Sequence, residues 1–176
     1  MIFQPTKLEG VYVIETERLE DDRGFFGRTW CQQEFAARGL NSQVNQASIS
    51  FNKRRGTLRG LHYQEAPHGE IKLVRVTRGA IFDVVVDLRP ESPTFKQWTA
   101  VELDQDNRLS LYIPDGFAHG FETLSDNAEV LYQISTPYVA SSVRGVRWND
   151  PAFGIQWPID VSVMAPRDRD YADCNL

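Results

Sequence analysis

The sequence predicts an all-β fold, an antiparallel sandwich or barrel with one short helix near the N-terminus. Many short stretches alternate apolar and polar residues with the two-residue period of a strand. Glycine, proline and aspartate turns separate these stretches at short intervals. The 176 residues contain no repeat, low-complexity segment or linker, so we expect a single domain over residues 1–176.

The N-terminal part predicts short strands followed by the helix. Residues 11–14 (VYVI) are the clearest strand, and residues 21–24 (DDRG) have the composition of a turn. Thr29 is placed to cap the helix, with Gln32 three residues later as in a capping box, and Gly39 suits its C-terminal end.

The rest of the chain predicts strands. A turn at residues 77–79 joins two of them, and residues 114–121 are expected to form a loop that carries His119. The polar tail after Pro158 is expected to fold back as a tail or minor helix. Strands are predicted at residues 45–51, 71–76, 80–88, 97–103, 109–113 and 128–134.

Composition excludes several classes of function. The formal net charge of −5 argues against general binding of nucleic acid, which favours a basic face. The first residues have no apolar signal core, and no stretch approaches the roughly 20 apolar residues of a membrane span. Cys31 and Cys174 lie far apart, as expected of reduced thiols in a cytoplasmic protein.

Residues 56–64 (GTLRGLHYQ) are the stretch most suggestive of chemistry. His62 is suited to proton transfer near neutral pH, although a half-buried strand with a hydrogen-bonded histidine is an equally good interpretation. Arg59 and His62 are three residues apart and would face opposite sides of a regular strand. A bulge at Gly60 would bring both side chains to one pocket.

The spacing of Pro114, Gly116 and His119 resembles the second half of the cupin signature. The first half needs two histidines one residue apart and then a glutamate, but this chain has His62-Tyr63-Gln64. Two histidines and a glutamine are a poor set of metal ligands. We therefore expect no metal and a pocket for a small molecule.

Several longer motifs resemble the dTDP-4-dehydrorhamnose 3,5-epimerase family of cupins. The resemblance extends over about residues 3–168 and implies a cupin-type antiparallel β-sandwich, or jelly roll, that forms homodimers. The motifs are RGFF (23–26), GTLRGLHYQ (56–64), KLVRV (72–76), DVVVDLR (83–89), SPT (92–94), GFAHGF (116–121) and WNDP (148–151).

The resemblance implies epimerisation of a nucleotide-linked, dTDP-type 4-keto-6-deoxy-hexose at C3 and C5, in deoxysugar biosynthesis for dTDP-rhamnose or polysaccharide. The 4-ketone acidifies the C–H bonds at C3 and C5. Inversion then needs a base on one face, a stabiliser for the enolate oxygen and an acid on the other face. This scheme requires no cofactor.

Four residues match the catalytic positions of the family. His62 matches the base and Asp168, in the tail, matches its partner. Lys72 matches the cation near the substrate oxygens, and Tyr132 matches the acid. By pattern alone, Asp168 would belong to a solvated charged tail and Tyr132 to the core.

The resemblance also implies a set of substrate-binding residues, some of which depart from the family pattern. Arg28 replaces a glutamate, Ser48 an asparagine, Val143 a glutamate and Arg167 a lysine. These changes leave the nucleotide, the sugar and the number of inverted carbons open. The implied binding residues are Arg23, Phe26, Arg28, Gln46, Ser48, Arg59, Lys72, His119, Tyr138 and Arg167.

Three alternatives to the 3,5-epimerase remain at this point. Two are enzymes on the same class of substrate, a 3-epimerase and a 3,4-ketoisomerase. The third is a cupin that binds nucleotide-sugar without catalysis. The joint presence of His62, Lys72, Tyr132 and Asp168 favours an enzyme, since a binding module has no need of both a base and an acid.

Overall fold

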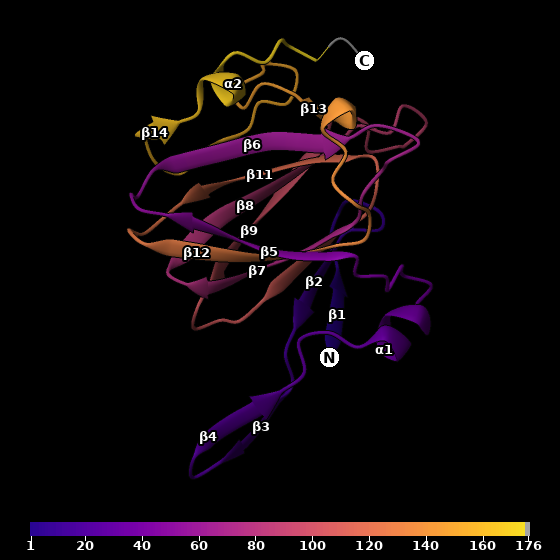
Figure 1. The fold of residues 1–176 in the computed structure, drawn as a ribbon, viewed down its shortest axis with the longest axis vertical. Helices are drawn as coiled ribbons and strands as arrows, with labels where there is room; N and C mark the ends of the chain where they lie inside the picture. The colour runs from indigo at the N-terminus through magenta and orange to yellow at the C-terminus, as the bar shows by residue number, and fades with distance from the viewer. Residues whose placement is uncertain (175–176) are drawn as a thin grey trace.

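The computed structural model describes residues 1–174, and it confirms the predicted all-β sandwich. Two sheets pack face to face, and every strand pair is antiparallel except β14 with β6 (Figure 1). The first sheet has the order β1 (Ile2–Pro5), β2 (Tyr12–Glu15), β10 (Ser110–Ile113), β7 (Lys72–Arg78), β12 (Ala128–Ile134) and β5 (Gln46–Asn52). The second has the order β13 (Val143–Gly145), β6 (Thr57–Gln64), β11 (Phe117–Thr123), β8 (Ala80–Asp87) and β9 (Trp98–Asp104), with β14 (Val163–Met164) beside β6.

Strand β8 is buried on both faces, which explains its dense run of valines. Val85 faces the first sheet and joins the core cluster that includes Val74 and Val130. Val84 and Val86 face the other way and pack under residues that follow β13, such as Phe153. The second sheet is therefore the middle layer of the molecule, and apolar residues are needed on both sides of it.

The prediction of a loop at residues 114–121 is wrong beyond Gly116. Strand β11 begins at Phe117, pairs with β6 and β8, and is buried along its whole length. Because both of its faces are covered, it has no alternation of apolar and polar residues, and the strand signal is lost. The true turn is short and ends at Gly116, which has a φ of 84°.

The predicted helix exists but is short, and its predicted cap is wrong. Helix α1 (Gln32–Ala36) follows Cys31, which makes no side-chain capping bond, so Thr29 does not cap it. Packing of Phe35 against Phe3 and Tyr112, at ring-centroid distances of 5.2 and 5.7 Å, holds the helix instead. None of the helices within residues 1–174 could span a membrane.

The predicted turn at residues 21–24 joins two strands that project from the body of the molecule (Figure 1). Strand β3 (Arg18–Asp21) pairs with β4 (Gly24–Gly27) as a separate two-stranded sheet, the β3–β4 hairpin. Its apolar side chains Leu19 and Phe26 are 69% and 71% exposed. Within residues 1–174, no other part of the chain covers this apolar surface of the hairpin.

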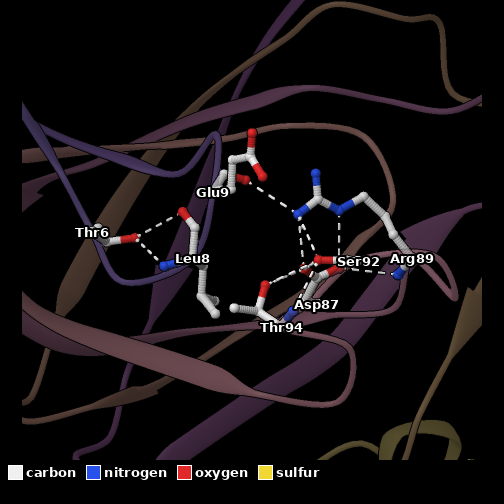
Figure 2. A network of polar contacts seen from close by, with 7 residues as sticks. All are labelled: Thr6, Leu8, Glu9, Asp87, Arg89, Ser92 and Thr94. Carbon is white, nitrogen blue, oxygen red and sulfur yellow. Dashed lines mark hydrogen bonds and ion pairs between the residues drawn. The ribbon is translucent and has the colours of Figure 1, made fainter.

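A buried polar network ties the loop after β8 to the N-terminal loop (Figure 2). The carboxylate of Asp87 accepts hydrogen bonds from the guanidinium of Arg89 and from the hydroxyls of Ser92 and Thr94, at 2.6 to 2.9 Å. Burial alone would raise the pKa of Asp87, but these hydrogen bonds outweigh it and lower the pKa to about 2. Arg89 also donates to the carbonyl of Glu9, which anchors the N-terminal segment.

The C-terminal segment folds back over the second sheet, as predicted for the tail. The 3₁₀ helix η1 (Ala140–Ser142) precedes β13, and the amide of Ser162 donates to the carbonyl of Gly56 at 2.8 Å. The short helix α2 (Pro166–Arg169) then lies beside β6 at the edge of the sandwich (Figure 1). This path delivers Asp168 to the middle of β6.

One buried carboxyl near this segment lacks a partner. Glu122, on β11, is fully buried, and neither oxygen accepts a hydrogen bond in the described structure. Burial raises its pKa to about 7, while the backbone N–H of Ile159, which is too poorly placed to form a hydrogen bond, and the charge of Arg55 lower it by less. A carboxylate at this position destabilises the fold above neutral pH.

We predict that Glu122→Gln stabilises the protein increasingly as pH rises. The folded pKa of about 7 lies above the ordinary 4.5, so the contribution of Glu122 to stability is greatest below pH 4.5 and is lost as pH rises from 4.5 through 7. The full loss is about 3 kcal/mol. Urea unfolding gives the free energy of unfolding of both proteins at pH 5 and at pH 8. The difference in favour of the variant should be larger at pH 8. Parallel pH curves for the two proteins would contradict this assignment.

Candidate active site

A cavity of about 370 Å³ opens between the two sheets and brings most of the predicted site residues together. Strands β5, β7 and β12 supply one wall, strands β6 and β11 supply the other, and α2 closes the side. The cavity is lined by Ser48, Ile49, Ser50, Arg59, His62, Tyr63, Gln64, Glu70, Lys72, His119, Gly120, Tyr132, Ile134, Tyr138, Val143, Ala165, Arg167 and Asp168.

A bulge at Gly60 places Arg59 and His62 in the same cavity, as the sequence predicts. His62 pairs with His119 and Arg59 pairs with Phe121, so three residue steps on β6 span two on β11. Gly60 takes a φ of 127°, and a Cβ there would lie 2.5 Å from the Cα of Gly120. Only glycine fits this conformation and this close approach of strands.

His62 is bound to the aspartate that the tail motif predicts. Its Nε2 lies 2.7 Å from Oδ1 of Asp168, whose second oxygen accepts from the backbone N–H of Gly60 at 3.2 Å. Burial would raise the pKa of Asp168, but the bonds from His62 and Gly60 and the charge of Arg167 lower it. An ionised Asp168 keeps the proton on Nε2, which leaves Nδ1 as the free basic nitrogen.

We predict that Asp168→Asn lowers turnover strongly while substrate binding stays nearly intact. The variant keeps the size of the side chain but loses the charge that stabilises the imidazolium and holds its tautomer, so kcat should fall by roughly 100-fold or more. Steady-state kinetics and the Kd for dTDP measure the two effects. Wild-type kcat in the variant would show that the pair serves folding alone.

Lys72 is held at the floor of the cavity by two acceptors. Its Nζ lies 2.9 Å from Oε1 of Glu70 and donates to the backbone carbonyl of His62 at 3.2 Å. The ammonium has three N–H donors, so one remains for a substrate oxygen. This arrangement fixes a cation beside His62.

Tyr132 comes from β12, on the wall opposite β6. Its ring packs edge-on against His119 at a centroid distance of 5.9 Å. Burial raises its pKa well above the ordinary value, with a further rise from Asp83 and an opposing effect of Arg59. The hydroxyl is therefore protonated at neutral pH, the state that a proton donor needs.

His119 belongs to a second histidine–aspartate pair. Its Nε2 lies 2.7 Å from Oδ1 of Asp83, and both side chains are buried. The other oxygen of Asp83 has no hydrogen-bond partner in residues 1–174. Because His119 stands directly opposite His62 in the β6–β11 register, the two histidines lie side by side in the sheet.

Four of the predicted binding residues do not line this cavity. Gln46 lies just outside it, where its side-chain oxygen accepts from the backbone N–H of Tyr138 at 2.8 Å. The other three lie on or just after the β3–β4 hairpin, where Arg23 pairs with Asp21 and Arg28 pairs with Glu34. The three residues are Arg23, Phe26 and Arg28, and their role in binding stays a prediction.

Three residues of the site escaped sequence reasoning. Glu70 precedes β7 and gives no strand signal, and Asn52 is an ordinary polar residue at the end of β5. Asp83 carries the clearest signal in retrospect, because a carboxylate inside a run of buried valines needs a partner. Asn52 and Asp83 have partners on other strands, Arg59 on β6 and His119 on β11, and Glu70 pairs with Lys72 on β7 from a position outside that strand. The composition of a single strand does not reveal such contacts.

No group of three side chains from His, Cys, Asp and Glu is placed to hold a metal ion within residues 1–174. His62 and His119 each direct one ring nitrogen to an aspartate. The expectation that the enzyme works without metal stays a prediction.

The sandwich and its acid–base cavity define a cupin-type sugar isomerase. Residues 5–175 match the family described as dTDP-4-dehydrorhamnose 3,5-epimerase, and the chain belongs to this family. It is 44% identical to the dTDP-4-dehydrorhamnose 3,5-epimerase of Methanothermobacter thermautotrophicus, with 96% of this chain and 92% of that one covered. It is also 39% identical to the dTDP-4-dehydrorhamnose 3-epimerase of Streptomyces niveus, with 97% and 82% covered.

A solved structure of the same family has the same fold. The dTDP-4-dehydrorhamnose 3,5-epimerase of Bacillus anthracis, solved with TDP and PPi bound, superposes with a TM-score of 0.94 at 38% identity. The match covers 98% of this chain and 99% of that one.

Proposed function

We propose that this enzyme inverts C3 and C5 of a dTDP-linked 4-keto-6-deoxy-hexose through an enolate, with His62 as base and Tyr132 as acid. Membership of the family supports the reaction. The observation that carries the residue roles is the placement of the His62–Asp168 pair and Tyr132 on opposite walls of one cavity. A base and an acid on opposite sides are what inversion requires.

The first step is removal of the proton from C3 or C5. The free Nδ1 of His62 takes the proton, and the electron pair of the C–H bond forms a C=C bond while the C4 oxygen becomes an enolate. The ammonium of Lys72 stabilises that oxygen, and Asp168 stabilises the imidazolium. Both charges are fixed before the reaction, so little reorganisation is needed.

The second step is return of a proton from the opposite face. The hydroxyl of Tyr132 protonates the carbon, and the electron pair of the enolate returns to the C4 carbonyl. The tyrosinate then takes a proton from solvent, and His62 releases its proton to solvent. Burial raises the pKa of Tyr132, and the nearby charge of Arg59 opposes that rise and so helps to stabilise the tyrosinate. Only protons move, so the scheme includes no cofactor.

The nucleotide part of the substrate binds at the mouth of the cavity. Arg59 and Arg167 offer guanidinium groups to the diphosphate, and the exposed ring of Tyr138 offers a surface on which the nucleobase can stack. Ser48 and His119 complete the walls around the sugar. The product serves deoxysugar biosynthesis, and the two free cysteines agree with a cytoplasmic location.

A nucleotide-sugar-binding cupin without catalysis is the rival from another class. Its cavity would have no need of a base held by an aspartate or of a protonated tyrosine opposite it. Deuterium uptake into the substrate in heavy water distinguishes the epimerase from the binding protein, because a protein that only binds the substrate shows no uptake. A 3-epimerase shows uptake at one carbon, and a 3,5-epimerase at two.

We predict that Tyr132→Phe separates exchange from inversion, whereas His62→Ala abolishes both. The phenylalanine keeps the ring but lacks the acidic hydroxyl. His62 still forms the enolate and returns a solvent-derived proton to the same face, so deuterium enters the substrate while inverted product falls steeply. NMR of one reaction in heavy water measures both rates.

Two outcomes of that experiment contradict the assignment. If Tyr132→Phe inverts the sugar at close to the wild-type rate, the acid is another group or water. If exchange and inversion fall together with a loss of thermal stability, Tyr132 is a core residue. Deuterium uptake by His62→Ala would remove His62 from the role of base.

The proposal includes a homodimer in which each β3–β4 hairpin completes the cavity of its partner. Within one chain the hairpin projects from the body of the molecule (Figure 1). Neither Arg23 nor Phe26 lines the cavity. The exposed apolar side chains of the hairpin favour burial against another surface. A second copy of the chain is the partner that these binding residues require.

We predict that two inactive variants restore activity when they share a dimer. His62→Ala lacks the base and R23A/F26A lacks the hairpin contacts, so each homodimer should turn over poorly. In a mixed dimer one cavity has an intact base and an intact hairpin, which restores about a quarter of wild-type activity after random exchange of subunits. Absence of any recovery, despite exchange shown by mass spectrometry, would place the hairpin outside the active site.

A further inference from the structure

Three cationic or titratable side chains of the cavity each have a carboxylate of their own. In every case the contact joins one nitrogen to one carboxylate oxygen at 2.7 to 2.9 Å. In each pair the carboxylate compensates the positive charge of the ammonium, or of an imidazolium when one forms. The pairs are His62–Asp168, Lys72–Glu70 and His119–Asp83.

Arg59 is different, because its partner is a neutral amide. Its Nε donates to Oδ1 of Asn52 at 2.7 Å, and no carboxylate within residues 1–174 forms an ion pair with it. Arg167 is intermediate, since its Nε lies 3.4 Å from the carboxylate that His62 uses. Arg59 therefore keeps the least compensated positive charge in the cavity.

Asn52 is fixed so that its oxygen must face Arg59. The side chain is 2% exposed, and Nδ2 donates to the carbonyls of Ser50 and Ala128 at 3.2 and 3.3 Å. Ala128 is the cross-strand partner of Asn52 at the end of the β5–β12 ladder, and Ser50 lies two residues before Asn52 on β5. The amide cannot turn over without placing an oxygen against two carbonyl oxygens.

We propose that Asn52 is a positioning residue that aims Arg59 at the diphosphate of the substrate without neutralising it. This inference rests on the proposed function, in which Arg59 binds phosphate. The bond to Nε leaves the two terminal nitrogens of the guanidinium free, and their planar fork suits two phosphate oxygens. A carboxylate in place of the amide would hold the side chain equally well but would compensate its charge.

The surroundings of Arg59 agree with an anion at this end of the cavity. A second cavity of about 390 Å³ shares Arg59 with the first and is lined by the exposed side chains of Lys53 and Arg54. This corner is positively charged although the chain as a whole has a formal net charge of −5. An approaching diphosphate meets a favourable potential here.

The test compares Asn52→Asp and Asn52→Ala with wild type. Calorimetry gives the Kd for dTDP at low and high salt, and NMR titration gives the Kd for thymidine, which has no phosphate. We expect Asn52→Asp to weaken dTDP by about 10- to 100-fold and to reduce the salt dependence of its binding. Asn52→Ala keeps the charge but frees the side chain, and should weaken dTDP by a smaller factor. Thymidine should bind all three proteins alike.

Two results would overturn the inference. One is a wild-type Kd for dTDP in both variants. The other is an equal loss of dTDP and thymidine affinity, which would make Asn52 a merely structural residue. Melting temperatures establish that each variant is folded, and Asn52→Ala avoids the repulsion that a carboxylate meets at the carbonyls of Ser50 and Ala128.

Arg59→Ala separates this inference from the proposed function. If Arg59→Ala leaves dTDP binding unchanged, Arg59 does not bind phosphate and the binding scheme itself is wrong. If Arg59→Ala weakens dTDP while the Asn52 variants do not, only the role of Asn52 is overturned.

Discussion

The contact between His62 and Asp168 is the constraint on which the site depends. It joins two residues 106 positions apart in the chain, and Asp168 also accepts from the backbone of Gly60, the residue that forms the bulge. One carboxylate thus holds His62, the bulged strand and the C-terminal segment together. Because Asp168 is buried and ionised, loss of its contact with His62 or with the backbone N–H of Gly60 leaves its charge less well stabilised.

The layered sandwich makes that contact possible. The second sheet is covered on one face by the first sheet and on the other by the C-terminal segment, so β6 lies where cavity and tail meet. The valines of β8 support β11 from the side, and β11 in turn fixes His119 opposite His62. Rigid strands rather than loops position His62, Tyr132 and Lys72, which suits a site that must hold charges in place.

The sequence predicts the strands in which apolar and polar residues alternate or valines are dense. It does not predict elements whose surroundings remove that alternation. The strands at residues 128–134 and 80–88 were predictable from alternation and from valine content. Strand β11 was not, since burial on both faces removes its alternation, and α1 rests on aromatic packing rather than on its predicted cap. The bulge at Gly60 was inferred from the three-residue spacing of Arg59 and His62, a geometric conflict visible in the sequence itself.

Two departures from the family pattern, at positions 28 and 143, change the charge of the residue, and the structure shows where each change lies. Arg28 replaces a glutamate but pairs with Glu34, so its charge is compensated where it lies. Val143, also in place of a glutamate, lines the cavity beside Gln64 and removes a carboxylate from the wall. The remaining acids of the cavity each have a basic partner, and Arg59 has none that is charged. The charges of the cavity therefore favour a dianionic ligand at the Arg59 end, and the valine at position 143, opposite Gln64 at the other end of β6, adds no negative charge to the wall.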